Sequence, residues 1–552
     1  MNELKKARMG MIAMLTVMLV SITRRLTGTR RLSSGMMTLA LTGMVLLVVA
    51  GGASANGACI GDVSNMVFGP GDTVTESCTL NDTMVCTGSG LIVGAEGITI
   101  DGNNFGITGS DAAWSYGILN YNAGQFRGYH NVVIENLDIS GFQEGICIQG
   151  TSTGPNTARV ENNTIYNCTV HDNGANTGEL NSGCGIHFYY NIWNSTIDNC
   201  KVYNTSATLQ SSCDSPGAGI RLYSKSCYNN VTNCEIYGNA LAGIYSKAGS
   251  KYNRIDNNDV YENAAPGAHI SFPGGIRMQC KNTNWWTVSN NEVWDNYGPG
   301  IFVGGQNCTI YNNEVTGSKN CTAVGDGSRG DGIIIDRSDT AVGGTYNTLT
   351  HNKVCENAGY DIYMQAGKVG NTGDENTCYT SSNYHDEGMT TGCDYACIIS
   401  CDASGNAKDE FAAGEKVYVK GGGYGISSGA SYNLWIQDDP VSDGDTLASD
   451  PSGGQETVMP SGTPPSFGPI EIWDTAANPA SLDEWDIVAD KQNDGANTGK
   501  YNRASDGIDS STIGTETMPG FVAPIPEVAT FALVGLGLLG LVGYSRLGRR
   551  KN

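Results

Sequence analysis

The stretch NNVTNCEIYGNALAGIYSKAGSKYNRIDNNDVYENAA, residues 229–265, contains the same short motif twice. The pattern V-x-N-x-x-I that starts at Val231 returns 24 residues later as I-x-N-x-x-V, starting at Ile255. The tripeptide Gly-Ile-Tyr at 243–245 lies between the two copies. Alternation of apolar and polar residues over a few positions is typical of a half-buried strand. We interpret one motif and the Gly-Ile that follows it as one coil of a repeating structure.

The motif repeats along about half of the chain. Its first aliphatic residues, called anchors here, are Ile100, Ile134, Ile165, Ile197, Val231, Ile255, Val288, Ile310 and Leu349. The position five residues after each anchor is also apolar, beginning with Phe105. A Gly-Ile pair follows in every copy except the last, where Asp361-Ile362 takes its place. The pattern predicts nine coils between residues 97 and 365, without helices.

A single coil of this kind has no core of its own. Stacking the coils at about 4.8 Å buries the aliphatic columns and pairs the backbones of neighbouring coils. Each fully buried Ile or Val contributes roughly 1.5–3 kcal/mol, so several per coil offset the poor strand propensity of Gly and Asn. We therefore predict an all-β fold built around a parallel β-helix.

Two polar positions recur in each turn of the motif. Asn stands two residues after most anchors, and it tolerates the left-handed backbone conformation of a sharp bend. The next position is Cys in three copies, Cys168, Cys200 and Cys234, and Asn in the copies that follow. The sequence leaves open which of these two columns points into the core.

The coils resemble the right-handed parallel β-helix repeats of the pectate-lyase-like superfamily, and are nearest to NosD-type periplasmic and archaeal surface proteins. The resemblance covers residues 100–365. It implies right-handed coils and a carbohydrate partner. We find no match to a catalytic motif of pectate lyases, polygalacturonases or alginate epimerases, so no residue role is transferred. Fold alone does not define function.

The two ends of the chain carry signals for export. Residues 1–55 contain apolar runs after basic residues and end in Ala53-Ser54-Ala55, which suits signal cleavage. Residues 518–552 combine Pro526-Glu527, a Gly/Leu-rich run and a basic end, and they resemble PEP-CTERM and PEF-CTERM sorting signals, although Val528 departs from both. The resemblance implies a transmembrane helix, processing by an exosortase or archaeosortase, and a cell-surface location. A permanent single-span anchor is the alternative.

The remaining segments complete the predicted domain order. Residues 56–96 are predicted to be an N-terminal cap, and 366–410 a cysteine-containing cap or linker. Residues 411–517 show alternating strands between turns, which indicates a small Ig-like β-sandwich. The chain has 18 Cys, an even number that favours disulfides in an exported protein, with a connectivity that cannot be read. The spacing of Cys393, Cys397 and Cys401 is wider than a zinc Cys-x2-Cys pair.

The charge of the chain excludes one class of partner. The formal net charge is −23 at pH 7. Such a surface repels nucleic acid and anionic lipid. It suits a salty exterior or divalent cations.

A candidate binding site follows from the longest insertions. They occur between the second apolar position and the Gly-Ile pair, and so on one edge of the rod, at 171–184, 203–218, 261–274 and 316–331. Solenoids commonly bind ligands beside such loops. The residue after Gly-Ile is predicted to point outwards there, which stacks His187, Arg221, Tyr245 and Arg277 in one column.

This column favours an acidic glycan as the ligand, because Arg contacts carboxylates with two hydrogen bonds and Tyr offers a stacking face. The alternative is an ordinary set of polar outward positions. The sequence thus predicts an envelope or matrix protein that is structural or binds acidic carbohydrate. A polysaccharide lyase, epimerase or glycoside hydrolase on the same rod is the other hypothesis. A lyase would use His187, Tyr245 or an Arg as the base, with a cation or Arg to stabilise the enolate. A hydrolase would need two convergent carboxylates, for which Asp326, Asp331 and Asp336 are the candidates.

Two further kinds of site are predicted. Asp490, Gln492 and Asp494 alternate before Gly495 as in a calcium loop, but Tyr501 stands where that loop has Glu. A polar turn is the alternative to calcium. Among the Asn-x-Ser/Thr sequences, Asn204 and Asn320 lie on loops and are the preferred candidates for glycosylation.

Overall fold

The computed structural model describes residues 56–523 except for 152–158, 175–182, 207–216, 267–272, 280–281, 322–328, 337–342, 413, 448–449, 453–454, 477–482 and 514–515. The predicted export segment and the apolar run of the predicted sorting signal lie outside these residues. Within the described part of the chain, no helix has the length and apolar character needed to cross a membrane.

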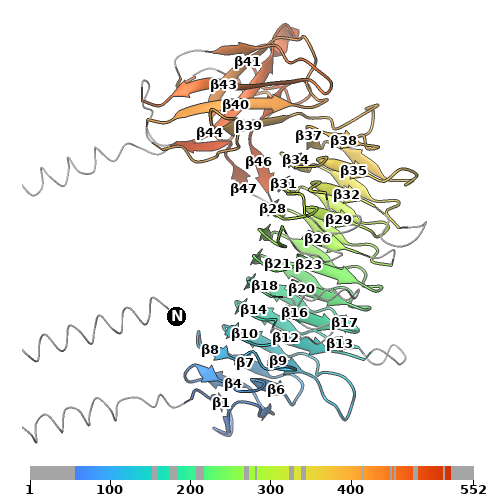
Figure 1. Cartoon of the computed structure of the whole chain (residues 1–552), viewed down its shortest axis with the longest axis vertical. Helices are drawn as coiled ribbons and strands as arrows, with labels where there is room; N and C mark the ends of the chain where they lie inside the picture. Colours follow the sequence, from blue (N-terminus) through green and yellow to red (C-terminus); the bar gives the residue numbers. More distant parts are fainter. Residues whose placement is uncertain are drawn as a thin grey trace, which may run out of the picture. The chain divides into compact units, whose positions relative to one another are not determined.

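Three long sheets wind around one axis to form a parallel β-helix (Figure 1). Successive strands of a coil belong to sheets A, C and B in turn, so each sheet gains one strand per coil. Sheet A contains β4 (Cys78–Leu80), β7 (Thr99–Asp101), β10 (Val133–Glu135), β14 (Thr164–Tyr166), β18 (Thr196–Asp198), β21 (Asn230–Thr232), β24 (Arg254–Asp256), β27 (Thr287–Ser289), β30 (Thr309–Tyr311), β33 (Thr348–Thr350) and β36 (Thr372–Asp374).

The other two sheets follow the same order along the axis. Sheet C contains β5 (Met84–Val85), β8 (Gly106–Thr108), β11 (Asp138–Ser140), β15 (Thr169–His171), β19 (Lys201–Tyr203), β22 (Glu235–Tyr237), β25 (Asp259–Tyr261), β28 (Glu292–Trp294), β31 (Glu314–Thr316), β34 (Lys353–Cys355) and β37 (Thr377–Cys378). Sheet B contains β3 (Thr73–Val74), β6 (Leu91–Val93), β9 (Tyr116–Asn120), β12 (Glu144–Gln149), β16 (Cys184–Tyr189), β20 (Ala218–Tyr223), β23 (Ala242–Lys247), β26 (Gly274–Met278), β29 (Ile301–Val303), β32 (Ile333–Ile335), β35 (Ile362–Met364) and β38 (Ser381–Ser382). A short pair, β13 (Val160–Glu161) and β17 (Ile192–Trp193), runs beside them.

The predicted anchors form one column in sheet A. Ile134 pairs with Ile165, Val231 with Ile255, and the other anchors follow in the same register. All of them are buried, as are the apolar residues of sheets C and B that face them. The repeat and its hydrophobic pattern are thus confirmed. In the first coil, the residue that takes the sheet C position is Ile107 and not Phe105, because that turn is two residues longer.

The rod extends beyond the predicted limits of 97 and 365. The predicted cap at 56–96 supplies β3, β4, β5 and β6, which join the three sheets as parallel strands. Only β1 (Cys59–Gly61) and β2 (Val67–Phe68) run antiparallel and cover the end of sheet A. At the other end, β36, β37 and β38 from the predicted linker add another coil. These coils lack the anchor motif, which is why the pattern did not reveal them.

The structure settles which polar column faces the core. The Asn two residues after the anchor, for example Asn257, has a φ of 55° and its side chain is exposed. The next position is buried: Asn258 Nδ2 donates to Asn291 Oδ1 over 2.9 Å, and the bond repeats from coil to coil. The backbone N–H of Cys234 joins this ladder by donating to Asn258 Oδ1 over 3.0 Å. The Cys and Asn positions therefore form a single inward column.

Three disulfides are present among the described residues. They join Cys59 to Cys78, Cys355 to Cys397, and Cys378 to Cys393. The disulfide interpretation of the segment 366–410 is thereby confirmed for Cys378, Cys393 and Cys397, while Cys401 is a free buried thiol. Nine other described cysteines are also free and buried, most of them in the coils, so fewer cysteines are paired than the even count suggested.

Two antiparallel sheets follow the rod. The first contains β39 (Cys397–Cys401), β40 (Lys416–Gly422) and β43 (Ser466–Asp474). The second contains β42 (Glu456–Val458), β41 (Tyr432–Asp438), β44 (Asp483–Lys491), β45 (Gly507–Ile508) and β48 (Phe521–Ala523), and β46 (Ser511–Ile513) pairs with β47 (Glu516–Met518). One 3-10 turn covers Gly495–Asn497. Residues of both sheets share one core, which includes Ile398, Ile436 and Trp485.

Candidate functional site

Sheet B brings the predicted column together. Cys147 pairs with His187, His187 with Arg221, Arg221 with Tyr245, and Tyr245 with Arg277 in consecutive strands. Each of the four predicted long insertions follows a strand of sheet C and precedes the sheet B strand of the same coil. Much of each insertion lies outside the described residues, so its place on the rod stays a prediction. The predicted register of the column is confirmed.

The column is not an open surface, however. His187, Arg221 and Arg277 are 2% exposed and Tyr245 is 0% exposed. The guanidinium carbon of Arg221 lies 4.4 Å from the ring centre of Tyr223, and that of Arg277 lies 4.0 Å from the ring centre of Phe302. The expectation of a groove-facing column is therefore wrong in this packing. Strand alternation defines the face of a sheet but does not show what covers it.

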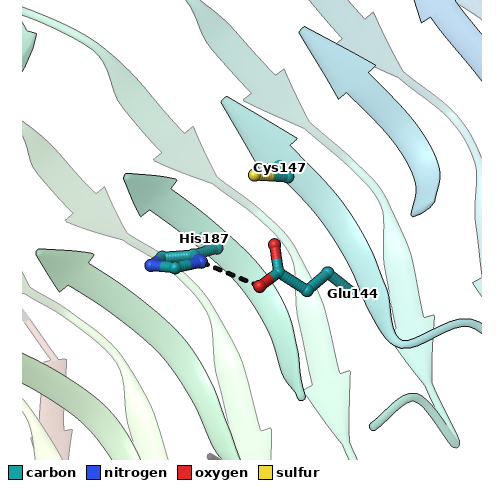
Figure 2. A group of neighbouring side chains, drawn as sticks. All are labelled: Glu144, Cys147 and His187. Carbon is teal, nitrogen blue, oxygen red and sulfur yellow. Dashed lines mark hydrogen bonds and ion pairs between the residues drawn. The ribbon is translucent and has the colours of Figure 1, made fainter. Parts of the chain in front are cut away.

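Two coils of this column carry a compact cluster of chemically active groups. Glu144 and Cys147 belong to β12, and His187 belongs to β16, so the cluster spans neighbouring strands (Figure 2). His187 Nδ1 donates to Glu144 Oε1 over 3.1 Å. One ligand atom from each of the three side chains lies within 4.8 Å of the others. All three are buried.

Burial and a nearby cation set the charges in this cluster. Burial lowers the pKa of His187, so the neutral imidazole is the form at neutral pH. Burial disfavours ionisation of Glu144, but the hydrogen bonds from His187 and Cys147, together with Arg221, bring its pKa below the ordinary value. Burial and the adjacent Glu144 raise the pKa of Cys147, which keeps the thiol protonated. The carboxylate is the acceptor that both other groups share.

An exposed set of aromatic residues lies where sheet B turns towards sheet A. Tyr228, Tyr252 and Trp285 are 44%, 40% and 40% exposed. The ring centres of Tyr228 and Tyr252 are 4.7 Å apart, and those of Tyr252 and Trp285 are 5.0 Å apart, with planes within 9°. Trp193 continues the row at 5.2 Å from Tyr228.

Basic side chains accompany these rings. The guanidinium carbon of Arg159 lies 3.5 Å from the ring centre of Trp193, and Lys251 Nζ lies 5.1 Å from that of Trp285. Distances in this range allow a cation–π interaction. We call the six residues Arg159, Trp193, Tyr228, Lys251, Tyr252 and Trp285 the basic-aromatic ridge.

The backbone at the ridge is unusual for aromatic residues. Tyr228, Tyr252 and Trp285 have φ values of 58°, 56° and 58°. Bulky residues rarely adopt this left-handed conformation, which costs an L-residue about 1–2 kcal/mol. The same position, three residues before the anchor, is Asn194 and Asn307 in the neighbouring coils, with φ values of 46° and 53°. Aromatic residues thus replace the residue best suited to the turn.

The sequence contained a signal for the ridge. Three residues before the anchor, the aligned coils have Tyr228, Tyr252 and Trp285 in succession and Tyr346 in the last coil, where other coils have Asn. Propensity also argues against aromatic residues in a left-handed turn, so nothing local indicated an exposed row.

A second row of rings lies on sheet C. Neighbouring ring centres are 4.4–4.9 Å apart with planes within 9° of parallel, and the row runs through His171, Tyr203, Tyr237, Tyr261 and Trp294. Each inner ring has both faces covered by its neighbours. This arrangement stabilises the stack but leaves only ring edges for a ligand.

The residues predicted to bind calcium are held by the protein itself. Asp490 Oδ2 accepts hydrogen bonds from the Gly499 N–H and the Gln492 amide, both over 3.1 Å. Asp494 Oδ2 accepts from Ser505 over 3.0 Å. These contacts are those of a polar turn, and calcium stays a prediction. Asn204 and Asn320 are both exposed, and their glycosylation also stays a prediction.

The acids proposed for a hydrolase do not form a described pair. Asp331 is buried and its Oδ2 accepts from Arg329 Nη2 over 2.7 Å, while its Oδ1 accepts from the Tyr360 N–H over 2.6 Å. Asp336 is buried as well, and Asp326 lies outside the described residues. A cavity of about 1080 Å³, which Glu292, Lys353 and Asp509 help to line, contains none of the predicted column.

Comparison with known families agrees with this geometry. Residues 117–315 match the model described as right handed beta helix region. The rod is therefore a right-handed parallel β-helix. Residues 270–394 in addition match the model described as periplasmic copper-binding protein (NosD). A comparison with curated proteins gave no match.

Solved structures give low similarity scores. A variant of the periplasmic alginate epimerase has a TM-score of 0.34 and 13% identity, over 53% of this chain and 61% of its own. A pectate lyase has a TM-score of 0.28 and 14% identity, over 57% and 69%. Tailspike protein 2 from Escherichia coli O157:H7 bacteriophage CAB120 has a TM-score of 0.41 and 11% identity, over 84% and 72%. This chain thus spans less than two thirds of the epimerase.

The copper in the second family name can be tested against the side chains. In the described part of residues 270–394, the His, Cys, Asp and Glu side chains form no group of three whose ligand atoms converge. The converging group in the described residues is Glu144, Cys147 and His187, outside the matched range. The described residues of the matched coils therefore do not fit copper by these ligands.

Proposed function

We propose that this chain is an exported cell-surface β-helix protein that binds an acidic polysaccharide along the basic-aromatic ridge. The observation that carries the proposal is the use of Tyr228, Tyr252 and Trp285 at left-handed positions where neighbouring coils have Asn. Backbone strain of this kind persists where the surroundings or the function require it. Stacking of the rings offsets part of the conformational cost of the left-handed residues. Contact with a ligand would be the function of these rings.

The chemistry of the ridge suits an acidic sugar polymer. Tyr and Trp combine an apolar ring with a polar end, and this amphipathic character is typical of binding surfaces. Arg159 and Lys251 supply positive charge in a chain of net charge −23, so anions are attracted to this strip rather than to the acidic surface around it. The row advances by 4.7–5.0 Å per coil, which gives an extended ligand a repeated set of contacts.

Export and attachment complete the proposal. Three disulfides among the described residues are typical of an oxidising compartment. We propose that residues 1–55 direct export, that the tail is a transmembrane sorting signal cut by an exosortase-type or archaeosortase-type enzyme, and that the two C-terminal sheets are an Ig-like spacer. A structural role in the envelope is compatible with this binding. No observation in the described residues favours a lyase, epimerase or hydrolase over binding.

The experiment replaces the ridge with the Asn of its neighbouring coils. The triple variant Tyr228→Asn, Tyr252→Asn, Trp285→Asn keeps a residue suited to φ near 55°, so its fold and unfolding midpoint should be preserved or improved. Its affinity for polyuronate in low salt should fall at least tenfold, while neutral dextran shows no retention of either protein. Tyr166→Asn, at an exposed tyrosine of sheet A, is the matched control.

A second pair of variants separates the ridge from the buried column. Arg221→Ala with Arg277→Ala should leave retention on polyuronate unchanged in the folded protein, because neither guanidinium is exposed. Loss of retention in this pair with an intact triple variant would move the site to the column. Equal retention of wild type and triple variant would overturn the proposal.

A further inference from the structure

Glu144, Cys147 and His187 have no part in the proposed glycan surface, and their chemistry points elsewhere. We propose that these three side chains form a binding site for a divalent transition-metal ion with affinity for sulfur and nitrogen, zinc or copper. The site lies in the outer layer of sheet B, on strands β12 and β16 (Figure 2). It goes beyond the proposed function and is independent of it.

The donor set matches such an ion. Thiolate, imidazole and carboxylate are the ligands of protein zinc sites, and three protein ligands with one open position are typical of sites that also bind water or a substrate. One ligand atom from each side chain lies within 4.8 Å of the others. Tetrahedral coordination needs donor atoms about 3.5 Å apart at metal–ligand distances near 2.0–2.3 Å, which small side-chain rotations would provide.

The scaffold holds the three groups in place. Cys147 and His187 occupy paired positions in adjacent parallel strands, so their separation is fixed by the ladder of sheet B. Glu144 is oriented by the bond from His187 Nδ1. Sites built on regular strands are more rigid than sites built on loops. The three groups are therefore close together before the ion binds, and the bond between His187 Nδ1 and Glu144 would be replaced by coordination.

The ring nitrogen that faces the cluster is the one placed to coordinate an ion. His187 Nδ1 lies beside Glu144, whereas Nε2 lies on the side of the ring away from Glu144 and Cys147 (Figure 2). Nε2 is buried without a hydrogen-bond partner among the described residues. An ion would therefore be held through Nδ1, with the ring proton on Nε2. The neutral imidazole favoured by burial is also the form that binds metals.

Arg221 is the neighbouring charge that acts against a cation. The positive charge of its guanidinium favours the ionised forms of Glu144, Cys147 and Cys184, and so acts to lower the pKa of each. A divalent ion bound by the Glu144 carboxylate and the Cys147 thiolate forms a neutral centre, so Arg221 would face no net positive charge. Binding releases the thiol proton of Cys147, whose pKa burial raises, and affinity should therefore fall as the pH is lowered.

The test uses the full chain purified from cells grown with added zinc, copper or cobalt. We expect about one ion per chain by elemental mass spectrometry, and a near-ultraviolet sulfur-to-cobalt absorption band in the cobalt form. Cys147→Ala should abolish the band and lower affinity at least tenfold, as should Glu144→Gln. Cys308→Ala, which removes a buried thiol bonded only to backbone carbonyls in the described structure, is the matched control and should bind as wild type.

Further outcomes decide between this site and a structural polar cluster. Competition between zinc and copper identifies the preferred ion. Circular dichroism verifies the fold of each variant. Fewer than 0.1 ions per chain for all three metals, or equal metal content in wild type, Cys147→Ala and Glu144→Gln, would overturn the proposal.

Discussion

Asn258 Nδ2 donates to Asn291 Oδ1 over 2.9 Å, and this bond joins two coils through the interior of the rod. Asn291 in turn donates to Asn313 and accepts from the backbone of Asn258, so one side chain satisfies groups in three coils. The inward ladder is thus a continuous polar element in the interior of the rod. Its members cannot be removed singly without leaving neighbours unsatisfied.

The first prediction concerns this ladder. Asn291→Ala should lower the free energy of unfolding by about 3 kcal/mol or more, because each buried polar group left without a partner costs about 1–3 kcal/mol. Asn257→Gly, in the exposed column with φ of 55°, is the control and should cost under about 1 kcal/mol, since glycine adopts that backbone freely. Chemical denaturation measures both. Similar losses in the two variants would contradict the assigned orientation of the columns.

The second prediction concerns the rings of sheet C. Tyr237 stacks between Tyr203 and Tyr261, at centre distances of 4.9 and 4.8 Å. Tyr237→Ala should destabilise the protein by about 1–3 kcal/mol, because an aromatic pair contributes about 0.5–1.5 kcal/mol beyond its buried area. The same unfolding experiment on Tyr166→Ala, at an exposed position of sheet A, should show a change within about 0.5 kcal/mol.

The third prediction concerns pH. Burial raises the pKa of Asp361 and Asp506 to about 6, and that of Asp486 to about 7. These folded-state values lie above the unfolded value near 3.9. Between pH 7 and 4 the native state therefore binds more protons than the unfolded state, and stability rises as the pH falls. Urea midpoints should be higher at pH 5.5 than at pH 7.5.

Two observations check the origin of this effect. Asp486→Asn should reduce the difference between the two midpoints, since it removes one of the titrating groups. His187 acts in the opposite sense, because its lowered pKa favours the native state above the unfolded value near 6.5 and opposes it below. A midpoint that is higher at pH 7.5 than at pH 5.5 would show that the buried carboxyls do not titrate in this range.

The fourth prediction concerns the disulfide between Cys355 and Cys397, which closes a sequence separation of 42 residues. Replacing both cysteines with alanine should lower the free energy of unfolding by roughly 2–4 kcal/mol, because the unfolded chain regains the freedom that the bridge removes. The variant Cys401→Ala removes a free buried thiol nearby and controls for lost packing. An equal loss in both variants would assign the effect to packing rather than to the bridge.

Much of the rod could be predicted from residue patterns. Anchors such as Ile134 and Val231 repeat with an invariant local spacing, and burial of aliphatic columns is the dominant requirement of a solenoid. The orientation of the Asn columns was not predictable, because Asn257 and Asn258 have the same side chain. Only the backbone conformation turns the first towards solvent and the second towards the core. The end coils escaped detection because Gly373 replaces an aliphatic anchor in β36.

The candidate sites were less accessible to such reasoning. The register of His187, Arg221 and Tyr245 followed from the repeat, but the repeat did not show that these side chains are buried, as in the contact of Arg221 with the Tyr223 ring. The cluster of Glu144 with His187 joins residues 43 positions apart through a register that only the assembled sheet defines. Short-range patterns contain no information on such contacts.

The coil-by-coil register of the ridge also links the length of the aromatic row to the number of coils. Tyr228, Tyr252 and Trp285 advance one coil at a time, and Asn194 and Asn307 occupy the same position in the coils on either side. Inserting or deleting one whole coil between them would lengthen or shorten the row by one ring. The contacts between neighbouring coils would otherwise be of the same kind as before. The length of polymer that the ridge can contact therefore depends on the number of coils that carry a ring.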